Sequence, residues 1–236
     1  MIQSILYLFV FAHLQSYIPE IPTNGNDNYL DQVIEELGKK WPENRTVNIV
    51  FHGHSVPAGY FKTPNVNTMN SYPFLFLLKL KEEYPYAVVN VIVTAKGGEN
   101  SENGSKRFQS EVLSHRPDVI FIDYALNDRN LGLDRSRSAW VEMIKSAKEY
   151  GAKVILMTPT PDLKENIKSH ESKLYKHADQ IRSLSSEFEI GLVDSYLKFR
   201  EIAKQESLTA YMSQANHINE SGHEIVANSI FSIFRK

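Results

Sequence analysis

Five short runs of apolar, mostly β-branched residues recur along the chain, and each is separated from the next by a stretch with helical periodicity. The runs lie at residues 47–51, 88–94, 119–122, 154–157 and 190–193. The inner runs are almost continuously apolar, as strands that are buried on both faces require. Helical patterns lie around them at residues 28–40, 71–84, 105–115, 134–150, 169–188 and 220–234. This alternation predicts an α/β fold with a parallel sheet and helices on both of its faces.

The length of the chain limits the number of domains. Its 236 residues suffice for one α/β domain with a sizeable core and are few for two ordinary domains. We therefore expect an N-terminal segment, residues 1–27, and a single domain at residues 28–236.

The N-terminal segment holds an apolar run at residues 5–12, followed by a Pro- and Asn-rich stretch at residues 13–27 that is typical of a linker. The run has the length of a signal-peptide core, but no Lys or Arg precedes it and no A-x-A pattern follows. Two interpretations stay open. The protein is secreted or periplasmic if this run is a signal peptide, and otherwise it is cytoplasmic with a truncated or buried apolar segment.

Charge and cysteine content exclude several classes of protein. The 26 basic and 28 acidic residues leave a net charge of -2, so nothing in the composition favours nucleic acid as a partner. The absence of cysteine excludes a disulfide framework, a thiolate zinc site and a cysteine nucleophile. No other stretch resembles a membrane span, so we expect no stable membrane insertion. The oligomeric state is not indicated.

Polar residues of catalytic type gather in four segments. Right-handed crossovers place the C-terminal ends of parallel strands at one edge of the sheet, and ligands bind in the crevice outside that edge. Three segments directly follow the first three predicted strands, and the fourth precedes the last helix. They are residues 51–59, 95–101, 123–129 and 216–223. We therefore expect the chemistry of this chain at that edge.

The four segments contain the groups that acyl transfer requires. Ser55, two residues after Gly53, is a hydroxyl at a turn, and His217 is an imidazole on a loop, where it can act as a base. The main-chain N–H of Gly98 and the side-chain amide of Asn127 are neutral donors suited to a developing oxyanion. Taken singly, each has an ordinary structural role: a helix cap, a surface histidine, a plain turn or an Asx-turn. Together they indicate a serine hydrolase.

The order Ser, Gly, Asn, His, with one residue per segment, resembles the SGNH (GDSL-like) hydrolase family, which is named after these four residues. The likeness covers residues 46–235. Gly53-His54-Ser55 matches the Gly-Asp-Ser block, and Gly98 matches the second block. Leu126-Asn127-Asp128 matches the Gly-x-Asn-Asp block, in which Ala125 replaces the Gly. Residues 216–223 match the His-Pro-Asn-x-x-Gly-His ending. The last match is the most specific.

The resemblance implies a three-layer α/β/α, flavodoxin-like fold with five parallel strands. It also implies hydrolysis of an ester, thioester or amide without a metal or an organic cofactor. Ser55 would be the nucleophile and His217 its base, with the N–H groups of Ser55 and Gly98 and the amide of Asn127 as the oxyanion hole. By family analogy, the expected substrate is a small molecule or glycan that carries a short acyl group, acetyl above all.

Two positions depart from the family pattern. His54 replaces the Asp that usually precedes the nucleophile, and Gln214 replaces the Asp three residues before the catalytic His. A carboxylate there fixes the tautomer of the His and stabilises the imidazolium. Three hypotheses follow. The first is a Ser-His dyad in which a backbone carbonyl or Gln214 orients His217, and the second is an acid recruited from elsewhere, with Asp162 or else Asp128 as the candidate. The third is a catalytically impaired descendant that binds a carbohydrate without cleaving it.

Further candidates surround these positions. His54 and Asp128 are candidates for substrate binding. A metal site made of histidines at residues 52, 54, 217 and 223 is less favoured, because no carboxylate accompanies the cluster at ligand spacing. The aromatic residues Tyr60, Phe61 and Tyr72 either line an acyl or sugar pocket or belong to the core. An O-acyltransferase that passes the acyl group to a sugar hydroxyl would use the same catalytic residues, so it remains an alternative function.

Overall fold

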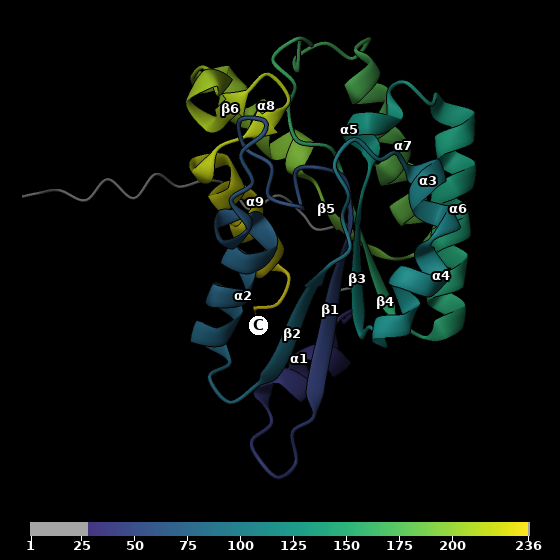
Figure 1. The fold of residues 1–236 in the computed structure, drawn as a ribbon, viewed down its shortest axis with the longest axis vertical. Coiled ribbons are helices and arrows are strands. Elements are labelled where there is room, and N and C mark those ends of the chain that lie inside the picture. Colours follow the sequence, from purple (N-terminus) through teal and green to yellow (C-terminus); the bar gives the residue numbers. More distant parts are fainter. Residues whose placement is uncertain (1–27, 236) are drawn as a thin grey trace, which may run out of the picture.

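The computed structural model describes residues 28–235 and contains a central five-stranded sheet with the strand order β2-β1-β3-β4-β5 (Figure 1). All four pairings are parallel. The strands are β1 Thr46–Gly53, β2 Val88–Val93, β3 Val119–Asp123, β4 Lys153–Met157 and β5 Gly191–Val193. Each coincides with one of the five apolar runs, so the predicted α/β fold with a parallel sheet is confirmed. The predicted N-terminal segment, residues 1–27, lies outside the described residues.

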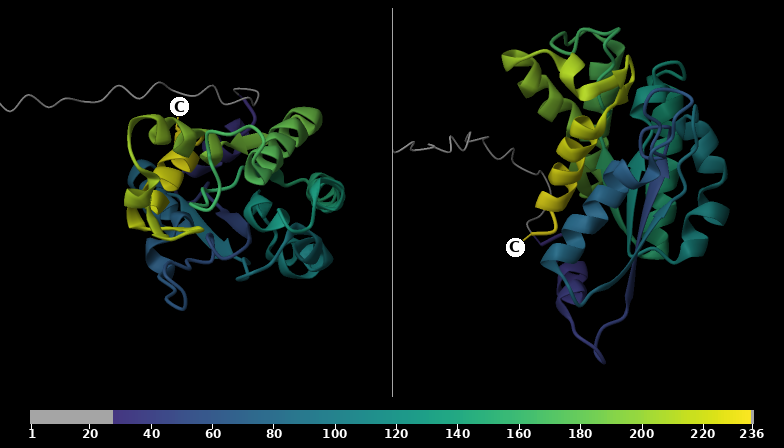
Figure 2. Two further views of the ribbon diagram at one scale, coloured as in Figure 1. Left: turned by 90° about the horizontal axis from the view of Figure 1, so that it is seen from above. Right: turned by 60° about the vertical axis from the view of Figure 1, so that its left-hand side comes forward.

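Helices cover both faces of the sheet, which gives the three layers that the family resemblance implied (Figure 2). The helices are α1 Asp31–Gly38, α2 Tyr72–Glu83, α3 Ser101–Lys106, α4 Phe108–Glu111, α5 Ala125–Asp128, α6 Leu133–Tyr150, α7 Lys173–Phe188, α8 Ser195–Gln205 and α9 Glu220–Ser232. Helices α1, α2 and α9 pack on one face, and α2 and α9 lie side by side. Helices α4 and α6, with the second half of α7, pack on the other face.

Alternate residues of the inner strands enter two separate cores. Phe51 and Phe121 pack on the face of α2 and α9, where their rings stack with centroids 4.5 Å apart. Val50, Ile120 and Ile122 pack on the face of α6. Because both faces of β1 and β3 are largely buried, these strands need the mostly apolar runs from which they were predicted.

The buried side of α2 differs from the sequence expectation. The sequence of residues 71–84 predicts an inner side with Phe74, Leu75 and Leu78. In the structure the fully buried large side chains are Tyr72, Phe76 and Leu80, Leu75 is partly buried against the same core, and Leu78 is 58% exposed. The prediction is wrong for Phe74 and Leu78, because residues 74–78 are apolar all around the helix and periodicity alone does not define one stripe. Packing against α9 and the sheet selects the row spaced by four residues.

The single helix predicted over residues 105–115 is also divided. The structure has α3, α4 and a 3-10 turn, Leu113–His115, in its place. Gly104 lies within α3 and allows a close approach, since a Cβ atom there would be 2.5 Å from the hydroxyl oxygen of Tyr124. Helix α3 thus packs closely on Tyr124, the residue directly after β3.

A small antiparallel hairpin, β6 Met212–Gln214 and β7 His217–Ile218, was not predicted. It carries Gln214 and His217, and the N–H of Leu163, in the loop after β4, donates to the Ala215 carbonyl at 2.7 Å. The hairpin is thus held beside the C-terminal edge of the sheet. Within residues 28–235, every helix is too short or too polar to cross a bilayer.

Candidate active site

The chain turns where β1 ends, and Gly53, the last residue of the strand, allows a close approach to β3 at this point. A Cβ atom at Gly53 would lie 2.5 Å from the carbonyl oxygen of Asp123 on β3, so a larger residue would push the two strands apart. After the turn, the N–H of His54 donates to that same carbonyl at 3.2 Å, and the N–H of Tyr60 donates to the Ser55 carbonyl at 3.0 Å. These bonds fix Ser55 at the edge of the sheet.

The structure brings Ser55 and His217 together across 162 residues of sequence. The hydroxyl oxygen of Ser55 lies 2.9 Å from Nε2 of His217. Both residues are largely shielded from solvent, with 7% and 5% of their surface exposed. A hydroxyl and an imidazole at this distance have the geometry of a nucleophile and its general base.

A main-chain carbonyl orients the imidazole. Nδ1 of His217 lies 2.7 Å from the carbonyl oxygen of Phe61. A carbonyl can only accept a hydrogen bond, so Nδ1 carries the proton and Nε2 presents its lone pair to Ser55. The carbonyl of Phe61 therefore does the work of orientation that an Asp does in a complete triad, although it brings no negative charge.

Gln214 supports this arrangement from the other side. Its amide oxygen accepts the N–H of Thr63 at 3.0 Å, which fixes the loop that carries Phe61. Its amide nitrogen lies 3.1 Å from the side-chain oxygen of Asn216 and 3.0 Å from Nδ1 of His217. Because Nδ1 carries its proton toward Phe61, the last contact is not a donated hydrogen bond. The structure thus gives Gln214 a role in holding the loop and the hairpin together.

Asp162 does not orient His217 in this structure, in contrast to the hypothesis that it supplies the missing acid. One of its carboxylate oxygens accepts from Arg129 at 2.8 Å, and the other accepts the N–H of Lys164 at 2.9 Å. Both oxygens are therefore occupied in stabilising the loop after β4. Arg129 also binds Glu165 at 2.6 Å, so it joins two acidic residues of this loop.

Asp128, a predicted substrate-binding residue and second candidate acid, is fully buried. Its carboxylate accepts the main-chain N–H of Ser101 at 2.8 Å and the indole N–H of Trp140 at 2.7 Å. Burial raises the pKa of this carboxyl, while the two donors act in the opposite direction. The prediction of substrate contact is wrong, because Asp128 instead ties the start of α3 to α6.

His54, the other predicted substrate-binding residue, is also fully buried, so that prediction is wrong too. Its Nδ1 accepts the N–H of Val56 at 3.2 Å. Its Nε2 lies 3.3 Å from a carboxylate oxygen of Asp123, a separation at which the two attract without hydrogen-bond alignment. The other oxygen of Asp123 accepts the hydroxyl of Tyr72 at 2.9 Å. Sequence reasoning missed Asp123, whose only signal is a carboxylate at the end of an apolar strand.

The three predicted oxyanion donors come from neighbouring strands. Gly98 lies in the turn after β2, where its positive φ of 76° favours glycine, and Asn127 lies in α5 after β3. The amide of Asn127 donates one hydrogen to the Glu99 carbonyl at 2.8 Å, which ties it to the turn of Gly98. Within residues 28–235, no acceptor takes the N–H of Ser55 or Gly98. These N–H groups are therefore available to a ligand at the edge of the sheet.

Burial sets the charge of the proposed base. Desolvation lowers the pKa of His217, the hydrogen bond to the Phe61 carbonyl raises it, and the nearby His54 lowers it further. The net shift is downward, so His217 is neutral near pH 7, as a general base must be.

The histidines considered as metal ligands are engaged elsewhere. Nδ1 of His52 lies 2.8 Å from the hydroxyl of Thr94, and its Nε2 lies 3.2 Å from the Gly104 carbonyl. His223 stacks on Phe61 with ring centroids 4.8 Å apart, and its Nδ1 accepts the N–H of Tyr72 at 3.1 Å. In the described part of the chain, no three His, Asp or Glu side chains form a group that could hold a metal ion.

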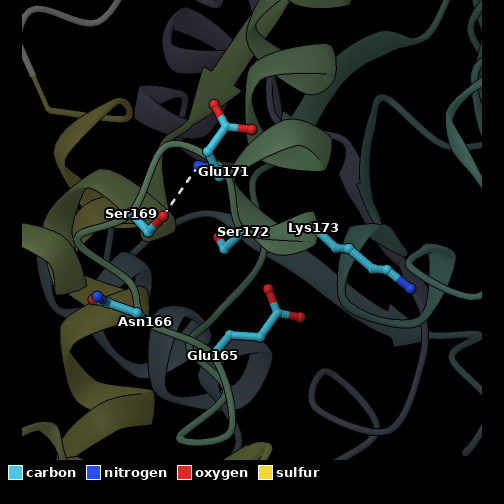
Figure 3. Close-up of a pocket in the computed structure, with 6 residues that line it drawn as sticks. All are labelled: Glu165, Asn166, Ser169, Glu171, Ser172 and Lys173. Atoms are coloured by element: carbon cyan, nitrogen blue, oxygen red, sulfur yellow. Dashed lines mark hydrogen bonds between the residues drawn. The ribbon is translucent and has the colours of Figure 1, made fainter.

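A separate pocket of about 440 Å³ lies in the loop between β4 and α7 (Figure 3). It is lined by Glu165, Asn166, Ser169, Glu171, Ser172 and Lys173. Ser169 accepts the N–H of Glu171 at 3.1 Å, and Glu165 accepts the N–H of Leu174 at 2.9 Å, so two of its polar side chains stabilise the loop itself. The pocket contains neither Ser55 nor His217 and is therefore separate from the candidate catalytic pair.

The chain is similar in sequence to a known family and to a bacterial protein. The model of the GDSL-like lipase/acylhydrolase family matches residues 51–225. A Bacillus subtilis (strain 168) protein described as the uncharacterized lipoprotein YqeF is 25% identical over 182 residues, which are 61% of this chain and 75% of that protein.

Two solved structures share the fold. Axe2, an acetylxylan esterase from Geobacillus stearothermophilus, has a TM-score of 0.71 at 18% identity, over 80% of this chain and 94% of that one. A two-domain esterase (CEX) active on acetylated mannans has a TM-score of 0.72 at 17% identity, over 90% of this chain and 54% of that one.

Proposed function

The chain belongs to the GDSL-like lipase/acylhydrolase family and is a carboxylic ester hydrolase, and we propose that it removes short acyl groups, acetyl above all, from an esterified carbohydrate. One observation carries the assignment of its residues: the hydroxyl of Ser55 lies 2.9 Å from Nε2 of His217. This distance supports the hypothesis of a Ser-His dyad oriented by a backbone carbonyl, and it gives no support to a protein that only binds.

In the proposed mechanism, Nε2 of His217 takes the Ser55 proton as the hydroxyl oxygen attacks the ester carbonyl carbon. The resulting oxyanion accepts hydrogen bonds from the N–H groups of Ser55 and Gly98 and from the free amide hydrogen of Asn127. His217 then gives its proton to the leaving alkoxide, and the acyl group stays on Ser55. Water, deprotonated by His217, attacks the acyl-enzyme, and Ser55 leaves with the proton as the carboxylic acid is released.

The substrate class rests on relatives of the same fold. Axe2 is an acetylxylan esterase and CEX is active on acetylated mannans, which supports an acetylated sugar as the substrate here. The proposed nucleophile lies on a loop at the end of a strand, so the acyl group is expected to enter a shallow crevice that suits small acyl groups.

The decisive experiment is labelling of the intact protein with a fluorophosphonate probe. We expect labelling of Ser55, located by peptide mass spectrometry, together with release of acetate from acetylated xylan. Neither should occur in Ser55→Ala. A folded wild-type protein that resists the probe and releases no acetate would refute the proposal. Transfer of acetyl to an added oligosaccharide in excess of hydrolysis would identify an acyltransferase instead.

The acidity of His217 gives a prediction on pH dependence. Activity requires neutral His217, so kcat/KM falls as pH decreases through the pKa of this imidazole. Because burial lowers that pKa, we expect the fall below the value of about 6.5 that is typical of a free imidazole.

Gln214→Glu tests the cause of this behaviour. It places a carboxylate oxygen where the amide nitrogen now lies, 3.0 Å from Nδ1 of His217. A nearby negative charge stabilises the imidazolium, so we expect the fall in kcat/KM to move to higher pH by about one unit. Gln214→Ala, which adds no charge, is the matched control and should not produce this shift. An unchanged profile in Gln214→Glu would contradict the assignment of His217 as the base.

We also propose that the protein is exported. The B. subtilis relative is described as a lipoprotein, and the apolar run at residues 5–12 has the length of a signal-peptide core. N-terminal sequencing of the protein recovered from its own host tests this, and retention of the whole apolar run in cytoplasmic protein would refute it.

A further inference from the structure

A partly exposed aromatic ring lies beside the dyad and has no role in the mechanism above. The ring centroid of Tyr60 lies 6.2 Å from that of His217. The edge of the ring that carries the hydroxyl also lies close to Gly97, where a Cβ atom would be 3.2 Å from two of its carbon atoms. Tyr60 therefore lies beside both the proposed base and the turn that carries Gly98, and its partly exposed ring forms a wall next to Ser55 and His217.

The position of this wall is fixed by the main chain. The N–H of Tyr60 donates to the carbonyl of Ser55 at 3.0 Å, and Tyr60 pairs with Val66 in an isolated β-bridge. Val66 is itself 48% exposed, so the apolar surface continues from the ring along this loop. A ring that is tied to the nucleophile through the backbone keeps a constant position relative to the reacting atoms.

The hydroxyl of Tyr60 has no hydrogen-bond partner among residues 28–235. By contrast, the buried hydroxyl of Tyr72 donates to Asp123 at 2.9 Å, and that of Tyr124 donates to Glu99 at 2.7 Å. Buried tyrosine hydroxyls are usually paired in this way, whereas one beside a crevice can bind a ligand. The Tyr60 side chain thus offers both an apolar face and an unused polar group.

The chemistry identifies which part of the substrate this wall meets. His217 must protonate the leaving alkoxide, so the alcohol portion of the ester lies next to its imidazole, on whose flank Tyr60 stands. The C–H-rich face of a sugar ring packs well on an aromatic face, and sugar hydroxyls pair with polar groups at its edge.

We propose that Tyr60 binds the sugar that carries the ester, with its ring against the apolar face of that sugar and its hydroxyl bonded to a sugar hydroxyl. The proposal rests on the esterase function proposed above and names the alcohol side of the same site. It makes Tyr60 a determinant of selectivity for the alcohol, without a part in the steps at the acyl carbon.

The first measurement is binding, which does not depend on turnover. In a Ser55→Ala background, calorimetry measures the Kd of an acetylated xylo-oligosaccharide and of an acetylated manno-oligosaccharide. We expect the added Tyr60→Ala to weaken binding of at least one of them by about tenfold, and Tyr60→Phe to weaken it by about threefold through loss of one hydrogen bond. Tyr86→Ala, at a 56% exposed tyrosine just before β2, is the matched control and should change nothing.

The second measurement uses protein in which Ser55 is intact. It compares hydrolysis of the same oligosaccharide with hydrolysis of ethyl acetate, whose alcohol is too small to reach the ring. We expect Tyr60→Ala to raise KM for the oligosaccharide about tenfold and to leave kcat/KM for ethyl acetate within about twofold. Unchanged binding in Tyr60→Ala, or an equal loss on both esters, would overturn the proposal. A wild-type protein that hydrolyses neither ester would instead refute the esterase function, while the binding measurement still decides the role of Tyr60.

Discussion

His217→Ala is expected to lower kcat for acetyl ester hydrolysis by about 10⁴-fold. In a serine protease with a complete triad, loss of the base costs about 10⁶ and loss of the acid alone about 10⁴ to 10⁵. Here the Phe61 carbonyl, 2.7 Å from Nδ1, retains the correct tautomer but supplies no charge. The present dyad therefore starts from a lower rate than a triad. The loss on removing His217 lies between about 10², the ratio of those two losses, and about 10⁶.

Initial rates with p-nitrophenyl acetate measure this loss. Ser55→Ala and the double variant should be as slow as His217→Ala, because residues that act as a unit are not additive. His115→Ala is the matched control at an exposed histidine and should keep full activity. A His217→Ala protein within tenfold of the wild type would show that another group is the base.

Asp128→Ala should lower the free energy of unfolding by about 2–4 kcal/mol. It would leave the N–H of Ser101 and the indole N–H of Trp140 without their acceptor in a fully buried site. Each unsatisfied buried donor costs about 1–3 kcal/mol, and removal of a buried carboxylate offsets part of that loss.

Burial raises the pKa of Asp128 above its value in the unfolded chain, about 3.9. Its contribution to stability is therefore fully present below that value and declines as pH rises through the folded pKa. The difference between Asp128→Ala and the wild type should be larger near pH 4 than near pH 7.

Urea unfolding at both pH values tests this prediction. Asp179→Ala, at an exposed carboxylate on α7, is the matched control and should change stability by less than about 0.5 kcal/mol. An Asp128→Ala midpoint equal to that of the wild type would mean that the two donors find other acceptors.

The sheet was predictable because its inner strands are buried on both faces. Val50 and Phe51 point into different cores, so the middle of β1 must be apolar on both faces, and the run Ile49-Val50-Phe51 is visible in the sequence. The β6–β7 hairpin could not be predicted, because strands of three and two residues are too short to show an alternating pattern of apolar and polar residues. Its position depends on bonds to distant loops, such as the one between Leu163 and Ala215.

The proximity of Ser55 and His217 was predictable from the order of their motifs along a parallel sheet. The burial of His54 and Asp128 could not be predicted, since histidine and aspartate occur both in substrate-binding crevices and, when paired, in protein cores. Burial was decided by partners far along the chain, Asp123 and Trp140.

The orienting group of His217 belongs to the peptide backbone, and this affects how the site responds to genetic change. Any amino acid at position 61 retains a carbonyl, so no point substitution deletes this group, as a single codon change deletes an aspartate. It is lost only by displacement of its loop, which rests on the stack of Phe61 on His223 and on the bond from Thr63 to Gln214. Heating or shortening this loop should therefore reduce activity more than a substitution at position 61 that leaves the loop in place.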